Sequence, residues 1–101
     1  MSSEPGASWT FLTNHTQVLL CLSQNTDVRM RDVAEAVGIT ERAAQRILAD
    51  LVAAGYVERA RVGRRNRYTV NRQRAMRHDA QLGRQIGGLL DLLELETPPP
   101  G

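Results

Sequence analysis

Arginine side chains carry most of the chemistry that this sequence offers. The chain has 101 residues and a formal net charge of +2, and all thirteen of its basic residues are Arg. Eight of them fall between Arg59 and Arg77, a stretch without an acidic side chain. The use of Arg in place of Lys would follow from a GC-rich genome alone. The clustering, however, predicts a polyanionic partner or a large solvated face.

A second set of polar side chains lies on the helix predicted after residue 40. Its core positions are expected to be Ala44, Ile47, Leu48 and Leu51. At about 100° per residue, Arg42 and Arg46 then point away from the core, with Ala43 and Gln45 on the flanks. Arg suits guanine O6 and N7, and Gln suits adenine N6 and N7, so this face fits base edges in a DNA major groove. Thr40, at the helix start, is expected to bind a phosphate.

Two short amphipathic helices within residues 30–52 position this face. In the first helix, apolar residues recur at the i, i+3, i+4, i+7 spacing of one buried face: Met30, Val33, Ala34 and Val37. Gly38 permits the positive φ that ends a helix, and Thr40 can accept a backbone amide as the next N-cap. Helices this short must cross steeply, so the stretch predicts a helix-turn-helix.

A β-hairpin is predicted after Gly55, which is expected to end the second of these helices. The runs 56–62 and 67–70 are β-prone and flank a turn at residues 63–66. Val28 to Met30 suits a very short third strand beside them. Arg64 and Arg65, at the turn, are expected to reach a minor groove or its phosphates. Further phosphate contacts are expected along the strands and before the hairpin, from Arg59, Arg61, Arg67, Arg29 and Arg31.

The segment before these elements is expected to be a flexible arm, residues 1–8, followed by a capped helix. Trp9 and Phe11 are too apolar to remain in water and should dock. Thr13 can cap a helix that ends near Asn25. Its inward-facing residues are expected to be Val18, Leu19 and Leu22.

The pattern from residue 9 to residue 72 resembles the winged helix-turn-helix of the MarR and ArsR classes of bacterial transcriptional regulators. The resemblance rests on VRMRDVAEAVGIT, on the helix ending in LVAAGYV and on the basic hairpin ARVGRRNRY. It implies a mainly α fold with a small β-hairpin wing (α+β). It also implies sequence-specific binding of double-stranded DNA, with recognition helix 40–54 in the major groove and wing 59–67 on the minor groove and phosphates. The basic wing makes solvation alone the weaker explanation for Arg42 and Arg46.

The C-terminal region, residues 73–95, is expected to be a linker and a helix that begins near Asp79. Apolar residues spaced four, three and four apart predict a coiled-coil seam, which an additional leucine widens. These dimerisation residues are Leu82, Ile86, Leu89, Leu93 and the additional Leu90. The alternative is that the helix packs on its own domain. Because the resembling regulators dimerise through terminal helices, a homodimer on a palindromic site is favoured, with half-sites about 34 Å apart. Residues 96–101 are expected to be disordered.

Other classes of function have little support in the sequence. His15 and His78 lie far apart, and no nucleophile with a base or phosphate loop is present, so no enzyme activity and no cofactor are expected. One cysteine, Cys21, offers no metal cluster and fits core packing better than redox sensing. No apolar run would span a membrane and no signal peptide is recognisable, which favours the cytoplasm.

The sequence also fits two alternative partners and one additional ligand site. A winged helix can serve as a protein-protein interaction module or as a nonspecific nucleic-acid binder. A cleft lined by Trp9, Phe11 and Leu82 is a candidate site for a small apolar effector.

Overall fold

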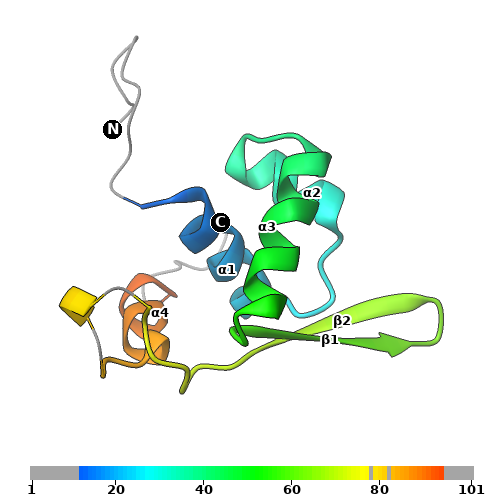
Figure 1. Ribbon diagram of the computed structural model, residues 1–101. Coiled ribbons are helices and arrows are strands. Elements are labelled where there is room, and N and C mark those ends of the chain that lie inside the picture. Colours follow the sequence, from blue (N-terminus) through cyan, green and yellow to red (C-terminus); the bar gives the residue numbers. More distant parts are fainter. Residues whose placement is uncertain (1–11, 78, 82, 95–101) are drawn as a thin grey trace, which may run out of the picture.

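The computed structural model describes residues 12–77, 79–81 and 83–94 (Figure 1). The arm predicted at residues 1–8, the tail at 96–101 and the side chains of Trp9, Phe11, His78 and Leu82 lie outside these residues. The described elements are α1 (Asn14–Gln24), α2 (Met30–Val37), α3 (Glu41–Ala53), β1 (Val57–Val62), β2 (Arg65–Val70), the 3₁₀ helix η1 (Asp79–Gln81) and α4 (Ile86–Glu94). The fold class is the predicted one, mainly helical with one small antiparallel hairpin.

Side-chain caps and glycines set the helix ends, as predicted. The Thr13 hydroxyl accepts a hydrogen bond from the Thr16 amide at 3.2 Å, and the Thr40 hydroxyl accepts one from the Ala43 amide at 3.0 Å. Each bond satisfies one amide that has no partner within its helix. Gly38 ends α2 with φ +86°, a left-handed conformation that a side chain would strain. These devices fix the tight turn between α2 and α3.

The core lies where the three helices of the N-terminal half meet the base of the hairpin. Helix α2 packs on α3, α1 packs on both, and β1 and β2 close the group. The residues with the least exposed side chains are Val18, Leu22, Val33, Ala44, Leu48, Val57 and Leu90. Helix α1 and helix α3 therefore contribute the inward faces that their spacing predicts.

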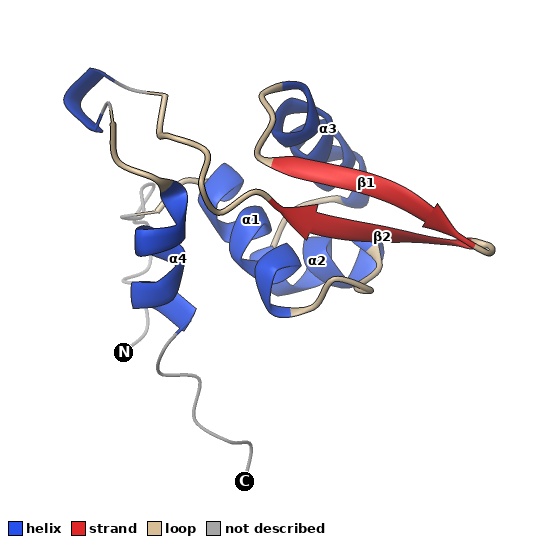
Figure 2. Cartoon of the chain, turned by 90° about the horizontal axis from the view of Figure 1, so that it is seen from below, coloured by secondary structure: helices blue, strands red, loops and turns tan. Residues whose placement is uncertain are grey.

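The hairpin projects well beyond the helices, and α4 lies on the opposite side of α1 from it (Figures 1 and 2). The two strands of the hairpin pair from Val57 opposite Val70 to Val62 opposite Arg65. The turn is therefore Gly63 and Arg64, shorter than the predicted turn at 63–66. Gly63 has φ +63°, as the first central position of a type II′ turn requires.

The predicted third strand at Val28 to Met30 is wrong. Met30 begins α2, and the Val28 amide donates to Asn25 within the preceding turn. In the described part of the chain, the sheet has two strands. A single backbone bond, from the Tyr68 amide to the Thr26 carbonyl at 3.0 Å, replaces the expected ladder.

The C-terminal helix also differs from the prediction. It begins at Ile86 and not near residue 79, after η1 and an isolated bridge between Ala75 and Gln85. Ile86 is 4% exposed and Leu90 is fully buried, and α4 packs against α1. These two side chains therefore cover their own domain, which is the alternative to a dimer seam that the sequence left open.

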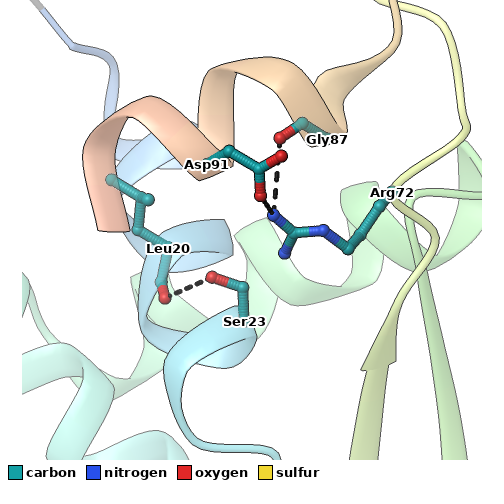
Figure 3. A network of polar contacts seen from close by, with 5 residues as sticks. All are labelled: Leu20, Ser23, Arg72, Gly87 and Asp91. Atoms are coloured by element: carbon teal, nitrogen blue, oxygen red, sulfur yellow. Dashed lines mark hydrogen bonds and ion pairs between the residues drawn. The ribbon is translucent and has the colours of Figure 1, made fainter. Parts of the chain in front are cut away.

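The segment that leaves β2 is joined to the first turn of α4 by several hydrogen bonds. The amide of Gly87 donates to the Arg72 carbonyl at 2.7 Å, and the amide of Ile86 donates to the Arg74 carbonyl at 2.9 Å. The Arg72 guanidinium in turn reaches the Gly87 carbonyl and the Asp91 carboxylate (Figure 3). In the same view, the Ser23 hydroxyl of α1 donates to the Leu20 carbonyl at 2.8 Å. Helix α4 is thus held to the segment that follows β2 as well as to α1.

Candidate nucleic-acid interface

Helix α3 separates a buried face from an exposed polar face. Ala44, Ile47, Leu48 and Leu51 are buried, whereas Arg42, Gln45 and Arg46 are exposed. Ala43 is half-buried at the margin, and its amide is the one that Thr40 caps. The Thr40 hydroxyl keeps its own proton for a further acceptor while it accepts this bond. Arg42, Gln45 and Arg46 therefore form an outward face on the N-terminal half of the helix.

A groove of about 430 Å³ lies between the start of α3 and the hairpin. Its walls come from three elements: the segment entering α2, the first turns of α3, and β2 with its turn. The lining side chains that matter here are Asp27, Arg29, Arg31, Glu41, Gln45, Arg64 and Arg65. The structure thus places Arg29 and Arg31 beside the wing arginines, although they are more than 30 residues away in the sequence. Its lining carries more arginines than that of the second groove, which lies near the C-terminal end of α3.

The five arginines predicted to form the wing contact are all exposed, but they do not share one face. Because side chains alternate along a strand, Arg59 and Arg61 lie on the face of the hairpin that carries Tyr68. Arg65 and Arg67 lie on the opposite face, and Arg64 is in the turn. One flat surface therefore cannot engage all five at once.

Arg67 differs from the other wing arginines because it already has an anionic partner. Its Nε donates to a carboxylate oxygen of Asp27 at 3.2 Å, and both side chains are about half exposed. This pair spans forty residues in sequence and joins the turn before α2 to the wing. Part of the Arg67 charge is thereby neutralised within the protein.

A second groove, of about 760 Å³, lies near the C-terminal end of α3. His15 and Asp50 line it, and the Nε2 of His15 is hydrogen-bonded to a carboxylate oxygen of Asp50 at 2.9 Å. Tyr56, Met76 and Arg74 also line it, and the Tyr56 hydroxyl donates to the Ala75 carbonyl at 2.6 Å. This groove differs from the predicted effector cleft, whose residues Trp9, Phe11 and Leu82 lie outside the described part.

Cys21 lies on α1, away from both grooves' lining residues, and packs against the core. Burial raises the pKa of its thiol. Among the described residues, no group of three or more His, Cys, Asp or Glu side chains is arranged to hold a metal ion. No helix in the described ranges has the length and apolar character needed to cross a membrane.

Three crossing helices followed by a basic hairpin define the winged helix-turn-helix class of DNA-binding domains. A family model for the MarR family matches residues 10–67, which is more than half of the chain. The chain therefore belongs to the MarR family, and it is a DNA-binding transcription regulator in the general sense that this family defines. A comparison with curated proteins finds no significant match.

Sequence reasoning did not identify Glu41 or the groove that it lines. Glu41 lies in the first turn of α3 and lines the cationic groove together with Gln45. The signal was present in the four-residue spacing of Glu41 and Gln45, which places both on one side of the helix. The groove itself required the wing and α2 to be placed beside α3.

Proposed function

We propose that this protein is a sequence-specific transcriptional regulator that binds double-stranded DNA as a homodimer on a palindromic site, in the bacterial cytoplasm. The observation that carries the proposal is the exposed face made by Arg42, Gln45 and Arg46 on a helix whose other face is buried. Side chains of these types match the hydrogen-bonding pattern of base edges in the major groove. Their position beside a cationic groove favours a nucleic acid over a neutral protein partner.

Recognition helix 40–54 would lie in the major groove, with its N-terminal half against the bases. The Arg-rich wing 59–67 would contact the minor groove and its phosphates, led by Arg64 at the turn. Thr40 would bind a phosphate at the helix start, where the partial positive charge of the helix assists. Residues 9–72 would form the DNA-binding domain, and residues 73–95 would form a linker and the dimerisation helix.

The dimer contact would use the outward side of α4, because its inward side is occupied. Ile86 and Leu90 are buried within the domain, so they are unavailable to a partner in this arrangement. Leu92 is 69% exposed, and Leu89 and Leu93 are partly exposed. A seam built on these three would pair two recognition helices for half-sites about one helical turn apart.

Two rival functions make different predictions for the same surface. A winged helix that docks another protein has no need of arginines on the helix, the turn and both faces of the hairpin. A nonspecific nucleic-acid binder would use the wing but gain no base preference from Arg42, Gln45 and Arg46.

We also propose a small apolar effector, bound in a cleft lined by Trp9, Phe11 and Leu82. Thermal-shift screening of apolar compounds would test it, and the absence of any stabilising compound would count against it.

The decisive experiment is selection from a randomised DNA duplex pool at two salt concentrations, together with the mass of the protein in solution. We expect a two-fold symmetric motif and a dimer. The double variant Arg42→Ala/Arg46→Ala should lose the motif and bind preferred DNA about as weakly as other DNA. The control Arg77→Ala/Arg84→Ala removes the same number of charges outside α3 and the hairpin and should keep the motif. Salt-sensitive binding without any motif would reject sequence-specific regulation, and absence of binding at low salt would reject DNA as the partner.

A further inference from the structure

The recognition helix presents two different rows of side chains. Arg42 and Arg46 are four residues apart and form one row, and Glu41 and Gln45 form the adjacent row. Only the second row lines the groove between α3 and the wing. The row nearer the wing therefore offers hydrogen-bond acceptors, whereas the other row offers only donors.

Glu41 is an unexpected residue in this setting. A carboxylate is repelled by phosphates, yet this one lies in a groove whose walls carry four arginines, Arg29, Arg31, Arg64 and Arg65. The other carboxylate that lines the groove, Asp27, is paired with Arg67. Within residues 12–77, 79–81 and 83–94, none of the ion pairs includes Glu41. Its side chain is exposed and is not committed to any of these arginines.

One role of Glu41 is a modest stabilisation of helix α3. It is the acidic residue in the first turn of α3, where a negative charge interacts favourably with the helix end. The first turn, however, already has a side-chain cap, because Thr40 accepts the Ala43 amide. A carboxylate that served only this purpose would gain nothing from lying beside Gln45 in the groove.

The chemistry of a carboxylate limits what it can recognise. An ionised Glu accepts hydrogen bonds and donates none, so it needs a base amino group, either N4 of cytosine or N6 of adenine. Adenine also presents the acceptor N7 beside its amino group, which repels a carboxylate, so cytosine fits better. It disfavours guanine O6 and N7 and thymine O4, because those edges present acceptors. The arginines on the two walls would hold the phosphates on either side and keep the carboxylate directed at a base edge.

We propose that Glu41 is a specificity-determining residue that selects cytosine at one position in each half-site, on the wing side of the recognition helix. This inference rests on the proposed binding of α3 in the major groove. It assigns opposite roles to the two rows, with Arg42 and Arg46 reading guanine and Glu41 reading the amino group of cytosine.

The test compares selected motifs for the unaltered protein, Glu41→Gln and Glu35→Gln. Glu35 is exposed on α2 and does not line the groove, so its substitution changes the net charge equally. We expect Glu41→Gln to lose about 5- to 150-fold of cytosine preference at one position per half-site, the value of one good base contact. Preference at that position should move towards adenine, which an amide can pair with through N6 and N7, and the other positions should stay unchanged.

Three further outcomes separate this inference from the proposed function. A motif that is identical for the unaltered protein and Glu41→Gln would reject the role of Glu41 and leave sequence-specific binding intact. A uniform rise in affinity, equal in Glu41→Gln and Glu35→Gln and without a change of motif, would likewise reduce Glu41 to a general charge. Binding without a motif by the unaltered protein would overturn both proposals. Thermal denaturation of each variant verifies that any change in the motif comes from a folded protein.

Discussion

The carboxylate of Asp27 lies 3.2 Å from Nε of Arg67, which ties the turn before α2 to the second strand of the wing. Close by, the Tyr68 amide donates to the Thr26 carbonyl at 3.0 Å. These two bonds anchor the middle of the hairpin, whose turn has no such support among the described residues. They also distinguish Arg67 from Arg64, since Arg67 meets an anion before any DNA is bound.

We therefore expect Arg64→Ala and Arg67→Ala to differ in salt dependence. The logarithm of the affinity falls as the logarithm of the salt concentration rises, and each lost phosphate contact makes this negative slope less steep by about 0.9 for duplex DNA. Arg64→Ala should make the slope less steep by about one unit per protomer. Arg67→Ala should have a smaller effect, because Asp27 already offsets its charge. The measurement is fluorescence anisotropy titration of one duplex over a series of salt concentrations. Equal decreases would show that the Asp27 pair opens on binding.

Alanine substitution at the two adjacent glycines of α4, Gly87 and Gly88, should change the free energy of unfolding in opposite directions. A Cβ added at Gly87 would lie 2.8 Å from the Arg72 carbonyl oxygen, whereas one added at Gly88 meets nothing within 4 Å. Gly87→Ala should destabilise the fold by about 1–3 kcal/mol, because backbone must shift. Gly88→Ala should stabilise it by about 0.5–1 kcal/mol through helix propensity. Urea unfolding of both variants checks this, and a harmless Gly87→Ala would refute the close approach of residues 72 and 87.

Two leucines of α4 separate folding from association. Leu90 is fully buried, so Leu90→Ala should cost about 2–5 kcal/mol of the free energy of unfolding. Leu92 is largely exposed, so Leu92→Ala should leave the unfolding of the protomer nearly unchanged and weaken the proposed dimer. Analytical ultracentrifugation over a range of concentrations measures the second effect. An unchanged dimer in Leu92→Ala would place the contact elsewhere.

The Cys21 thiol should react slowly in the folded protein. Burial raises its pKa, so at a given pH a smaller share is thiolate than in a free cysteine. Alkylation by iodoacetamide should therefore be slower in the native protein than in urea, and should accelerate as the pH approaches the raised pKa. Since the folded state holds this proton more tightly, the corresponding contribution to stability declines as the pH rises through that value. Equal native and unfolded rates would contradict the burial of the thiol.

Much of the helical part of the fold follows from local rules. Thr13 and Thr40 are caps because their hydroxyls reach amides three residues ahead, and Gly38 ends α2 because it accepts a positive φ. The buried faces of α1 and α3 follow from the 3.6-residue period. Each of these signals lies within a few residues of the feature that it predicts.

The remaining features depend on contacts between distant segments. The spacing of Ile86 and Leu90 suits a dimer seam and an inward-packing helix equally, and only the position of α1 decides between them. Likewise, Val28 is a β-branched residue typical of strands, but its amide is hydrogen-bonded to Asn25 within the turn before α2. The exposed face of α3 was predictable from its angle, whereas the groove that adds Glu41, Arg29 and Arg31 needed the hairpin and α2 in place.

Part of the hairpin extends beyond its contacts with the helices, and this affects both its local opening and the conformational entropy that it loses on binding. Val57 and Tyr68 are buried at the base, whereas the strand residues next to the turn at Gly63 are exposed or half-exposed. Amide hydrogens near the turn should therefore exchange through small fraying motions, and those near Tyr68 through larger openings. If DNA fixes the turn as proposed, the strand ends lose conformational freedom, and part of the favourable free energy of an Arg64–phosphate contact would offset that loss.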